Sequence, residues 1–257
     1  NDVVRLHAKA LRNGLDIQQI HHAYSGADIA LWDIIGQKLG EPIYRLLADL
    51  SQATTGGQVI PHAKLPYASV LFGDTPEATH QIAAQLRERG YRAAKFGWGP
   101  MGKFGEENDI ALVRAAREGM GEDAQMMIDA GVVWGDDDET AYQRAKAFAQ
   151  FNPTWLEEPL SPDAIEAYSA LSRRKPPVPI AAGEGSGTYR MAEDLIRHGG
   201  IQFVQIDVGR IGGITTAFRV RQLAEHHGIQ YVNHTFKSHL SLAASLHLFA
   251  TNEAFDL

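Results

Sequence analysis

Hydrophobic and polar positions follow two patterns along the chain. Residues 27–47 (ADIALWDIIGQKLGEPIYRLL) place apolar side chains at helical spacing, with a break at Gly40 and Pro42. From about residue 65, short apolar runs alternate with amphipathic stretches. The runs predict seven strands, at residues 65–71, 92–98, 125–130, 154–159, 179–184, 203–208 and 230–234. The stretches between them predict helices, among them 77–90, 109–121, 139–150 and 215–228.

This alternation predicts an α/β fold in which parallel strands are joined by crossover helices. Two architectures fit the pattern, a doubly wound open sheet and a closed (β/α) barrel. An open nucleotide-binding sheet normally carries a glycine-rich phosphate loop after its first strand. Residues 69–78 (SVLFGDTPEA) contain neither G-x-G-x-x-G nor a Walker pattern, which favours the barrel.

Polar residues stand at or near the ends of six successive apolar runs. They are Lys95, Asp129, Glu157, Glu184, Asp207 and His234. The intervals from the first of the acidic residues onward are 28, 27, 23 and 27 residues, close to one strand–helix unit each. Any one of these residues could be a helix cap or a satisfied polar group. Because the carboxyl ends of barrel strands converge on one mouth, their succession favours a shared site.

Three of these residues are carboxylates on successive strands. Asp129, Glu157 and Glu184 suit a hard divalent cation such as Mg²⁺, which prefers oxygen ligands. Without a cation, three such groups would repel one another strongly. Side chains alternate along a strand, so only one of Glu157 and Glu158 can face the site, and Glu158 is expected either to support the ligands from behind or to be structural.

The remaining polar residues suggest acid–base chemistry. An Asp207 carboxylate bonded to His234 would fix the imidazole as a general base and then a general acid. His239 is a rival, but we expect it in the following loop or the first helical turn. Lys95 either stabilises negative charge on a substrate or forms a salt bridge to a metal ligand. Lys237 is either a second cation or a solvated loop lysine.

Composition narrows the class of protein. The 257 residues carry 24 Lys and Arg against 31 Asp and Glu, a formal charge of −7, which argues against a nucleic-acid partner. No apolar run approaches the roughly 20 residues of a membrane-spanning helix. The absence of cysteine excludes a thiol nucleophile and a thiolate zinc site. No signal peptide stands at the start, so we expect a cytoplasmic protein that acts on a small molecule.

Taken together, these signatures resemble the enolase superfamily, specifically the mandelate racemase/muconate lactonizing enzyme family and its mandelate racemase subgroup. Residues 27–47 resemble the helical end of the family's capping domain. Five further segments resemble the successive signatures of the family's barrel: 128–130 (IDA), 155–159 (WLEEP), 181–184 (AAGE), 205–215 (QIDVGRIGGIT) and 233–234 (NH). The resemblance implies a modified TIM barrel, (β/α)₇β. Residues 1–58 would be a remnant of the N-terminal capping domain. Residues 59–257 would form the barrel, incomplete at its C-terminus, where 255–257 (FDL) would begin an eighth strand.

The resemblance also implies a mechanism. Mg²⁺ would be held by Asp129, Glu157 and Glu184, and Asp207 with His234 would form the catalytic dyad. The shared step is removal of a proton α to a carboxylate, which gives an enediolate that the metal and one lysine stabilise. That lysine is Lys95 in the present sequence. A homo-oligomer is expected, as is frequent in this family.

Two departures from the subgroup pattern narrow the chemistry. Gly97 stands where the second lysine of Lys-x-Lys serves as a base, and Gly131 replaces the asparagine of Asp-Ala-Asn. Both changes are expected to open space on the same side of the site. Racemisation through two bases is therefore disfavoured. A single histidine suffices to dehydrate an acid sugar to a 2-keto-3-deoxy acid.

Three alternatives stay open. Asp207 replaces the strand-6 lysine of muconate-lactonizing and dipeptide-epimerising relatives, but a cycloisomerase or a racemase/epimerase of the same superfamily is compatible with the other signatures. A non-catalytic metabolite-binding homologue would share the fold with a damaged site. A metal-dependent hydrolase would normally need histidines at the early strand ends, where this sequence has none.

Overall fold

The computed structural model describes residues 5, 21–55, 60–236 and 238–252. The chain divides into two compact units, which are described separately. The first unit comprises residues 1–64, 183–196 and 204–256, and the second comprises residues 65–182, 197–203 and 257. Lys237 and the predicted eighth strand at 255–257 lie outside the described residues, as do parts of the predicted capping segment.

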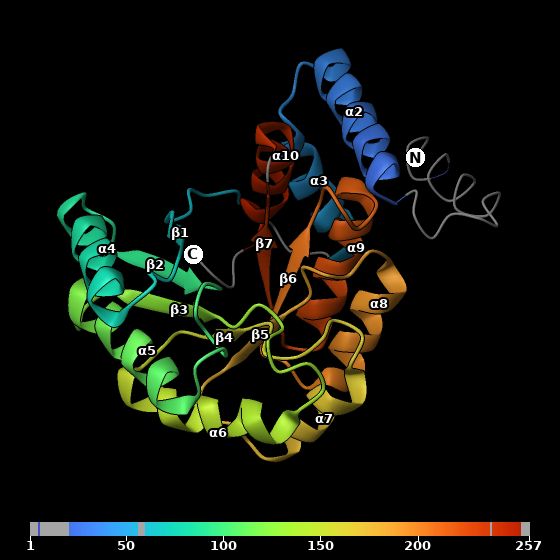
Figure 1. The fold of residues 1–257 in the computed structure, drawn as a ribbon. Helices are drawn as coiled ribbons and strands as arrows, with labels where there is room; N and C mark the ends of the chain where they lie inside the picture. Colours follow the sequence, from blue (N-terminus) through green and yellow to red (C-terminus); the bar gives the residue numbers. More distant parts are fainter. Residues whose placement is uncertain (1–4, 6–20, 56–59, 237, 253–257) are drawn as a thin grey trace. The chain divides into compact units, whose positions relative to one another are not determined.

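The second unit consists of parallel strands joined by helices. Its strands are β1 (Ala68–Leu71), β2 (Ala93–Gly97), β3 (Gln125–Asp129), β4 (Leu156–Glu157) and β5 (Ile180–Ala182). Its helices are α4 (Pro76–Glu88), α5 (Glu106–Met120), α6 (Asp138–Phe148), η2 (Ala149–Phe151) and α7 (Ile165–Arg173). Each strand pairs in parallel with the next one along the chain, and α4 to α7 follow one another along the outer side of the strands (Figure 1).

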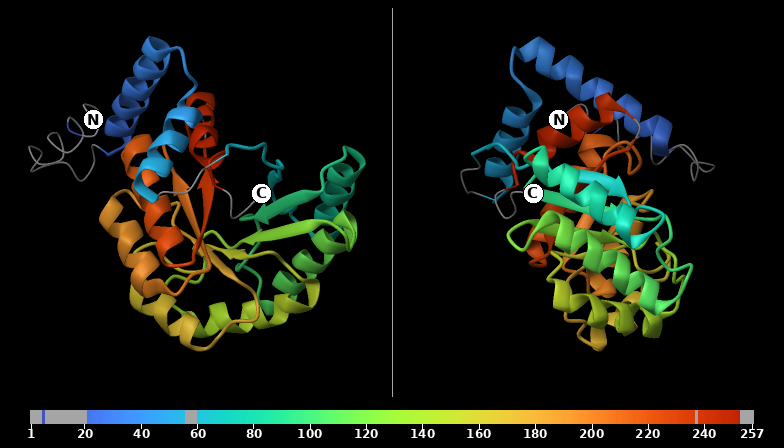
Figure 2. Two further views of the ribbon diagram at one scale, coloured as in Figure 1. Left: turned by 180° about the vertical axis from the view of Figure 1, so that it is seen from behind. Right: turned by 60° about the vertical axis from the view of Figure 1, so that its left-hand side comes forward.

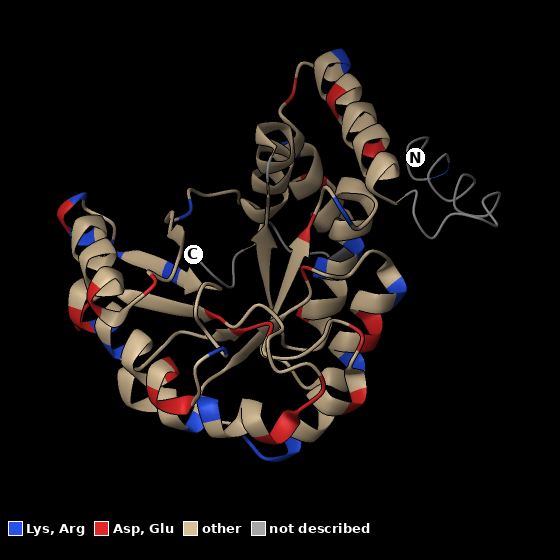
Figure 3. Cartoon of the chain, in the orientation of Figure 1, with Lys and Arg blue, Asp and Glu red and all other residues tan. Residues whose placement is uncertain are grey.

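Local sequence explains these elements. All five residues of β2 are buried, as expected for a parallel strand covered on both faces. Helix α4 begins with a Thr75 cap, whose hydroxyl accepts the Ala78 N–H at 3.3 Å, and Pro76 occupies its first turn. Many more Asp, Glu, Lys and Arg residues of this unit lie on the helices than on the strands (Figure 3). The helices thus supply the polar surface and the strands supply the core.

The first unit contains α2 (His21–Leu39), α3 (Ile43–Thr55), α8 (Tyr189–Asp194), α9 (Gly213–His226) and α10 (His239–Phe249). Its strands are β6 (Phe203–Asp207), whose first residue is counted with the second unit, and β7 (Gln230–His234). The π-helical turn η3 (Leu195–Gly199) follows α8, and its last three residues are also counted with the second unit. The predicted break between α2 and α3 is present, with Gly40 in the left-handed region at φ 68°. Both α9 and α10 contact β7, and Figure 2 shows this region from behind.

Helix α2 holds the start of α9 through side chains. The Gly212 N–H donates to Ser25 Oγ at 2.9 Å, and the Thr215 N–H donates to Asp28 Oδ2 at 3.0 Å. The indole N–H of Trp32 donates to Thr215 Oγ1 at 2.9 Å. Since Gly212 has no side chain with which to cap α9, α2 satisfies these first N–H groups instead.

The seven strands follow the sheet order β1 to β7, which is also their order along the chain. The α/β class and all seven predicted strands are therefore confirmed, and the fold is consistent with the predicted modified TIM barrel. None of the helices in the described ranges is long and apolar enough to cross a membrane.

Candidate active site

Strand register brings three of the predicted site residues together in the second unit. Asp129 is the register partner of Glu157, at the ends of β3 and β4. The Lys95 ammonium donates to Glu157 Oε1 and lies 3.4 Å from Asp129 Oδ2. The three residues are 5%, 6% and 0% exposed for Lys95, Asp129 and Glu157. They form a buried cluster of two carboxylates and one cation.

Further donors orient the two carboxylates. The Trp155 indole N–H donates to Glu157 Oε2 at 2.8 Å, and the Gly131 N–H donates to Asp129 Oδ1 at 2.9 Å. Burial alone lowers the pKa of Lys95, but the negative charges of Glu157 and Asp129 outweigh it and raise the pKa above its usual value. The salt bridge to predicted ligands, one of the two alternatives for Lys95, is thus present. Its role toward a substrate stays a prediction.

The second glutamate of WLEEP has different partners. Glu158 lies in the left-handed region at φ 40°, and its Oε2 accepts a hydrogen bond from the Tyr168 hydroxyl at 3.1 Å. Burial, and then the charge of Glu158, raise the pKa of Tyr168, so the phenol remains a donor. These contacts agree with a structural role for Glu158.

The other predicted residues meet in the first unit. His234 Nδ1 lies 2.9 Å from Asp207 Oδ2, and its Nε2 lies 2.9 Å from Glu184 Oε2. The Gly209 N–H donates to Asp207 Oδ1 at 2.8 Å and so orients this carboxylate. The structure therefore forms the contact that the dyad requires, while the catalytic roles of its members stay predictions.

Two features of this cluster were not predicted. Arg210 Nη1 lies 3.4 Å from Glu184 Oε1, and Arg210 Nε lies 3.5 Å from Asp207 Oδ2. Arg210 thus contacts both carboxylates that flank His234. Glu184 also lies in a turn, because β5 ends at Ala182 rather than continuing to 184 as predicted. The one sequence signal for Arg210 is its position three residues after Asp207.

The predicted metal ligands divide between the units. Asp129 and Glu157 belong to the second unit and Glu184 belongs to the first. Within the described residues, no three His, Asp or Glu side chains form a group that could hold a metal ion. The donor chemistry nevertheless suits Mg²⁺, because register-paired carboxylates on β3 and β4 supply only oxygen ligands. The three-ligand set stays a prediction. His239, the rival histidine, is the first residue of α10.

Gly97, the last residue of β2, and Gly131, two residues after β3, do not open space, contrary to the sequence-based expectation. A Cβ on Gly97 would lie 2.6 Å from Cβ of Asp129. A Cβ on Gly131 would lie 2.8 Å from Cδ2 of the Trp98 indole. The space beside each glycine is thus filled by a neighbour. Gly97 allows Asp129 to approach closely, and Gly131 accommodates Trp98.

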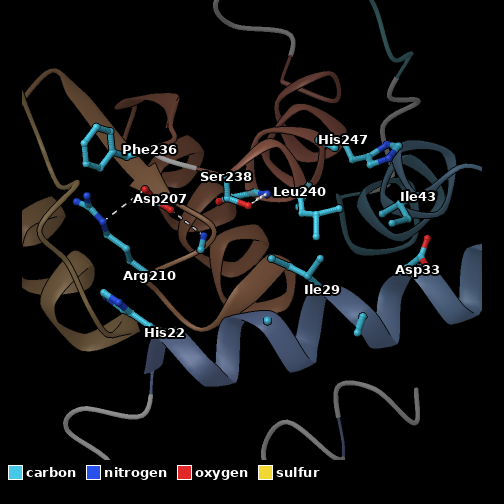
Figure 4. Close-up of a pocket in the computed structure, with 16 residues that line it drawn as sticks. His22, Ile29, Asp33, Ile43, Asp207, Arg210, Phe236, Ser238, Leu240 and His247 are labelled. Atoms are coloured by element: carbon cyan, nitrogen blue, oxygen red, sulfur yellow. Dashed lines mark hydrogen bonds and ion pairs between the residues drawn. The ribbon is translucent and has the colours of Figure 1, made fainter.

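A cavity of about 800 Å³ lies within the first unit (Figure 4). Asp207, Arg210 and Ser238 line its polar part, whereas Ile29 and Leu240 belong to its apolar part. Its remaining lining residues come mainly from α2, α3 and α10 and include Ile43, Asp33, Ala244 and His247. The dyad aspartate therefore borders a cavity.

A parallel α/β fold with carboxylates, a lysine and an Asp–His pair at its strand ends is the architecture of an enolase-type barrel. Residues 77–257 match the family model for "Enolase C-terminal domain-like" proteins. The chain belongs to this family.

Four relatives illustrate the similarity. The chain is 32% identical over 273 residues to L-talarate/galactarate dehydratase of Salmonella typhimurium, covering 100% of this chain and 62% of that protein. It is 32% identical over 232 residues to D-galactarolactone cycloisomerase of Agrobacterium fabrum, and this match covers 89% of this chain and 57% of that protein. A crystal structure of a predicted mandelate racemase from Rhodobacter sphaeroides superposes with a TM-score of 0.90 at 44% identity, covering 98% and 62%. A racemase from Streptomyces coelicolor A3(2) with bound magnesium gives a TM-score of 0.82 at 26% identity, covering 97% and 65%. The chain thus spans about three-fifths of the length of these curated relatives.

Proposed function

We propose that the protein removes the proton α to a carboxylate of an acid sugar and expels the β-hydroxyl, giving a 2-keto-3-deoxy acid. The observation that carries this proposal is the His234 imidazole held by Asp207 at 2.9 Å. The similarity to a galactarate dehydratase supports acid sugars as the substrate class. The curated cycloisomerase relative supports lactone formation or opening as the second candidate.

His234 carries both proton transfers in this proposal. Asp207 accepts the Nδ1–H, which fixes the tautomer and leaves Nε2 as the base. Nε2 takes the α-proton, and the electron pair of the broken C–H bond moves toward the substrate carboxylate. The same nitrogen then returns the proton to the β-hydroxyl, which departs as water when the C–O bond breaks. Tautomerisation of the resulting enol gives the 2-keto acid.

The developing negative charge needs cations nearby, since an α-proton of a carboxylate is barely acidic in water. Asp129, Glu157 and Glu184 would hold Mg²⁺, which when bound supplies a Lewis acid for the substrate carboxylate. Lys95 places a permanent positive charge beside two of these ligands. Glu184 Oε2 lies 2.9 Å from His234 Nε2. Metal binding by Glu184 would compete with this contact and leave the lone pair of Nε2 available to take the α-proton.

Two observations favour one base over two. Position 97 carries no side chain, and a Cβ there would meet Asp129 at 2.6 Å, so no lysine fits without a shift of β3. At position 131, Trp98 occupies the corresponding space. A group that protonates the opposite face of the substrate is therefore missing from these two positions, which suits dehydration better than racemisation.

The direct experiment offers acid sugars, including galactarate and D-galactarolactone, to the full-length protein with Mg²⁺ and measures 2-keto-acid formation. We expect the 2-keto acid from an acyclic acid sugar. The His234→Asn variant should lose roughly 10²–10⁴-fold in kcat, the usual contribution of a general acid–base. His239→Asn is the matched control and should keep full activity.

Deuterated water separates the candidate reactions. Dehydration gives a 2-keto acid, whereas lactone interconversion gives none. Deuterium incorporation at the α-carbon without net product would indicate racemisation or epimerisation. Full turnover by His234→Asn, or no reaction with any acid sugar, would refute the proposal.

We also propose a homo-oligomer. Ile34 and Leu39 on α2 are 58% and 59% exposed, which leaves apolar surface available for self-association. Light scattering of the full-length protein should give a mass that is a multiple of the monomer. A monomer at micromolar concentration would contradict this part of the proposal.

A further inference from the structure

Trp98 differs from the other tryptophans of the chain in its exposure. It directly follows β2, whose five residues are all buried, yet half of its own surface is exposed. Trp32, Trp134 and Trp155 are 6%, 9% and 0% exposed. A large aromatic side chain is therefore exposed to solvent directly after a buried strand, three residues beyond Lys95.

The backbone of Trp98 is in a conformation that bulky residues avoid. Its φ is 57°, in the left-handed region, where a residue other than glycine is uncommon. The turn is held by two hydrogen bonds, from the Trp98 N–H to the Asp129 carbonyl at 3.2 Å and from the Met101 N–H to the Trp98 carbonyl at 3.1 Å. Strain of this kind collects at functional sites, where the surrounding structure maintains it.

The indole lies against the end of β3. A Cβ on Gly131 would meet its Cδ2 at 2.8 Å and its Cε2 at 2.9 Å, so the ring rests on the glycine backbone. The N–H of Gly131 in turn donates to Asp129 Oδ1. The ring is thus fixed beside the carboxylate end of the buried cluster while much of it remains open to solvent.

We propose that Trp98 is a substrate-contacting residue that sets specificity, with its indole forming an apolar wall against the C–H groups of the acid sugar. This inference rests on the proposed function and deepens it. A flat aromatic surface packs against the carbon skeleton of a polyol and gives no hydrogen bond to hydroxyls that point toward it. Trp98 directly follows Gly97, the last residue of β2, which has no acid–base side chain. The indole would therefore give the substrate an apolar contact at this strand end in place of a proton-transferring group.

Fluorescence quenching tests this contact directly. Acrylamide should quench mainly Trp98, because the other three tryptophans are at most 9% exposed. Trp98→Phe should remove the readily quenched component and so identify it. In the His234→Asn background, which does not consume the ligand, galactarate with Mg²⁺ should protect this component from acrylamide.

Kinetics of the full-length protein give the second readout. Trp98→Ala should raise KM and lower kcat/KM about tenfold, with a smaller change in kcat, since the loss is one of aromatic contact. Trp98→Phe should recover most of kcat/KM. Phe104→Ala is the matched control, because Phe104 is a 72% exposed aromatic residue on the same loop and should leave both constants unchanged.

The outcomes separate this inference from the function beneath it. Turnover of an acid sugar combined with unprotected Trp98 and unchanged Trp98→Ala kinetics would overturn the inference and leave the proposed function standing. If no acid sugar reacts, the proposed function fails and the inference fails with it. If Trp98→Ala does not fold, the quenching of the wild-type residues and Trp98→Phe still decide the matter.

Discussion

Replacing Lys95 by methionine removes the cation between two buried carboxylates. Glu157 and Asp129 are 0% and 6% exposed, and Lys95 Nζ contacts both. Loss of one partner from a buried ion pair typically costs about 3–5 kcal/mol, because the remaining charge is left uncompensated. In a protein of this size each kcal/mol lowers Tm by about 2–4 °C, so we expect a fall of roughly 6–20 °C in EDTA.

Magnesium should offset part of this loss. A cation at 100 times its Kd stabilises a folded protein by about 2.7 kcal/mol. Mg²⁺ should raise the Tm of Lys95→Met more than the Tm of the wild type, because the two carboxylates of the variant have lost the positive charge of the lysine. Differential scanning calorimetry of both proteins, in EDTA and in Mg²⁺, measures the two effects. Lys103→Met, at an exposed lysine, is the control.

Two results would refute this reasoning. If the Tm of Lys95→Met in EDTA lies within about 1 °C of the wild-type Tm, losing the lysine does not cost the expected free energy of unfolding, about 3–5 kcal/mol. If Mg²⁺ raises the Tm of both proteins equally, the lysine and the cation do not share these carboxylates.

Two further predictions concern the first unit. Asp28→Ala should lower the free energy of unfolding, measured by urea denaturation, by about 1–2 kcal/mol, because the buried Thr215 N–H loses its acceptor. Asp28→Asn keeps a side-chain oxygen and should lose less. Equal losses in the two variants would contradict the capping role. Burial lowers the pKa of His247 from its ordinary 6.5, despite the opposing effect of Asp33, so protonation favours unfolding. The stability that neutral His247 contributes is fully present above about pH 6.5 and is lost as the pH falls through the lowered pKa. On acidification, the Tm of the wild type should therefore fall more than the Tm of His247→Phe. A Tm difference between the two proteins that stays constant with pH would contradict this prediction.

The order of elements could be predicted from the sequence because apolar runs and helical stretches differ in period. All seven strands lie where the runs indicate, but several are shorter. Strand β4 ends at Glu157 because Glu158 turns to φ 40°, and β5 ends before Gly183, whose φ is 127°. Such turns depend on contacts with neighbouring segments, which hydrophobic periodicity does not report.

The strand-end residues were also accessible to sequence reasoning, since parallel register places Asp129 beside Glu157. The contact of Arg210 with Glu184 was not, because it joins side chains from the segments that follow two different strands. Its contact with Asp207 is local, but spacing alone does not show that the side chain turns back toward that carboxylate. The expectation of open space beside Gly97 and Gly131 was wrong for a related reason. It required knowing that Asp129 lies against Gly97 and that Trp98 lies against Gly131, and nothing in the local pattern predicts the positive φ of Trp98.

Calorimetric titration of the full-length protein with Mg²⁺ tests the central proposal, that Asp129, Glu157 and Glu184 bind one cation. The wild type should bind one Mg²⁺ per chain, and Asp129→Asn, Glu157→Gln and Glu184→Gln should each abolish the binding heat. Glu158→Gln, altered at the neighbouring residue, should bind as the wild type does. Unchanged affinity in Glu184→Gln, or equal losses in Glu157→Gln and Glu158→Gln, would contradict the proposed site.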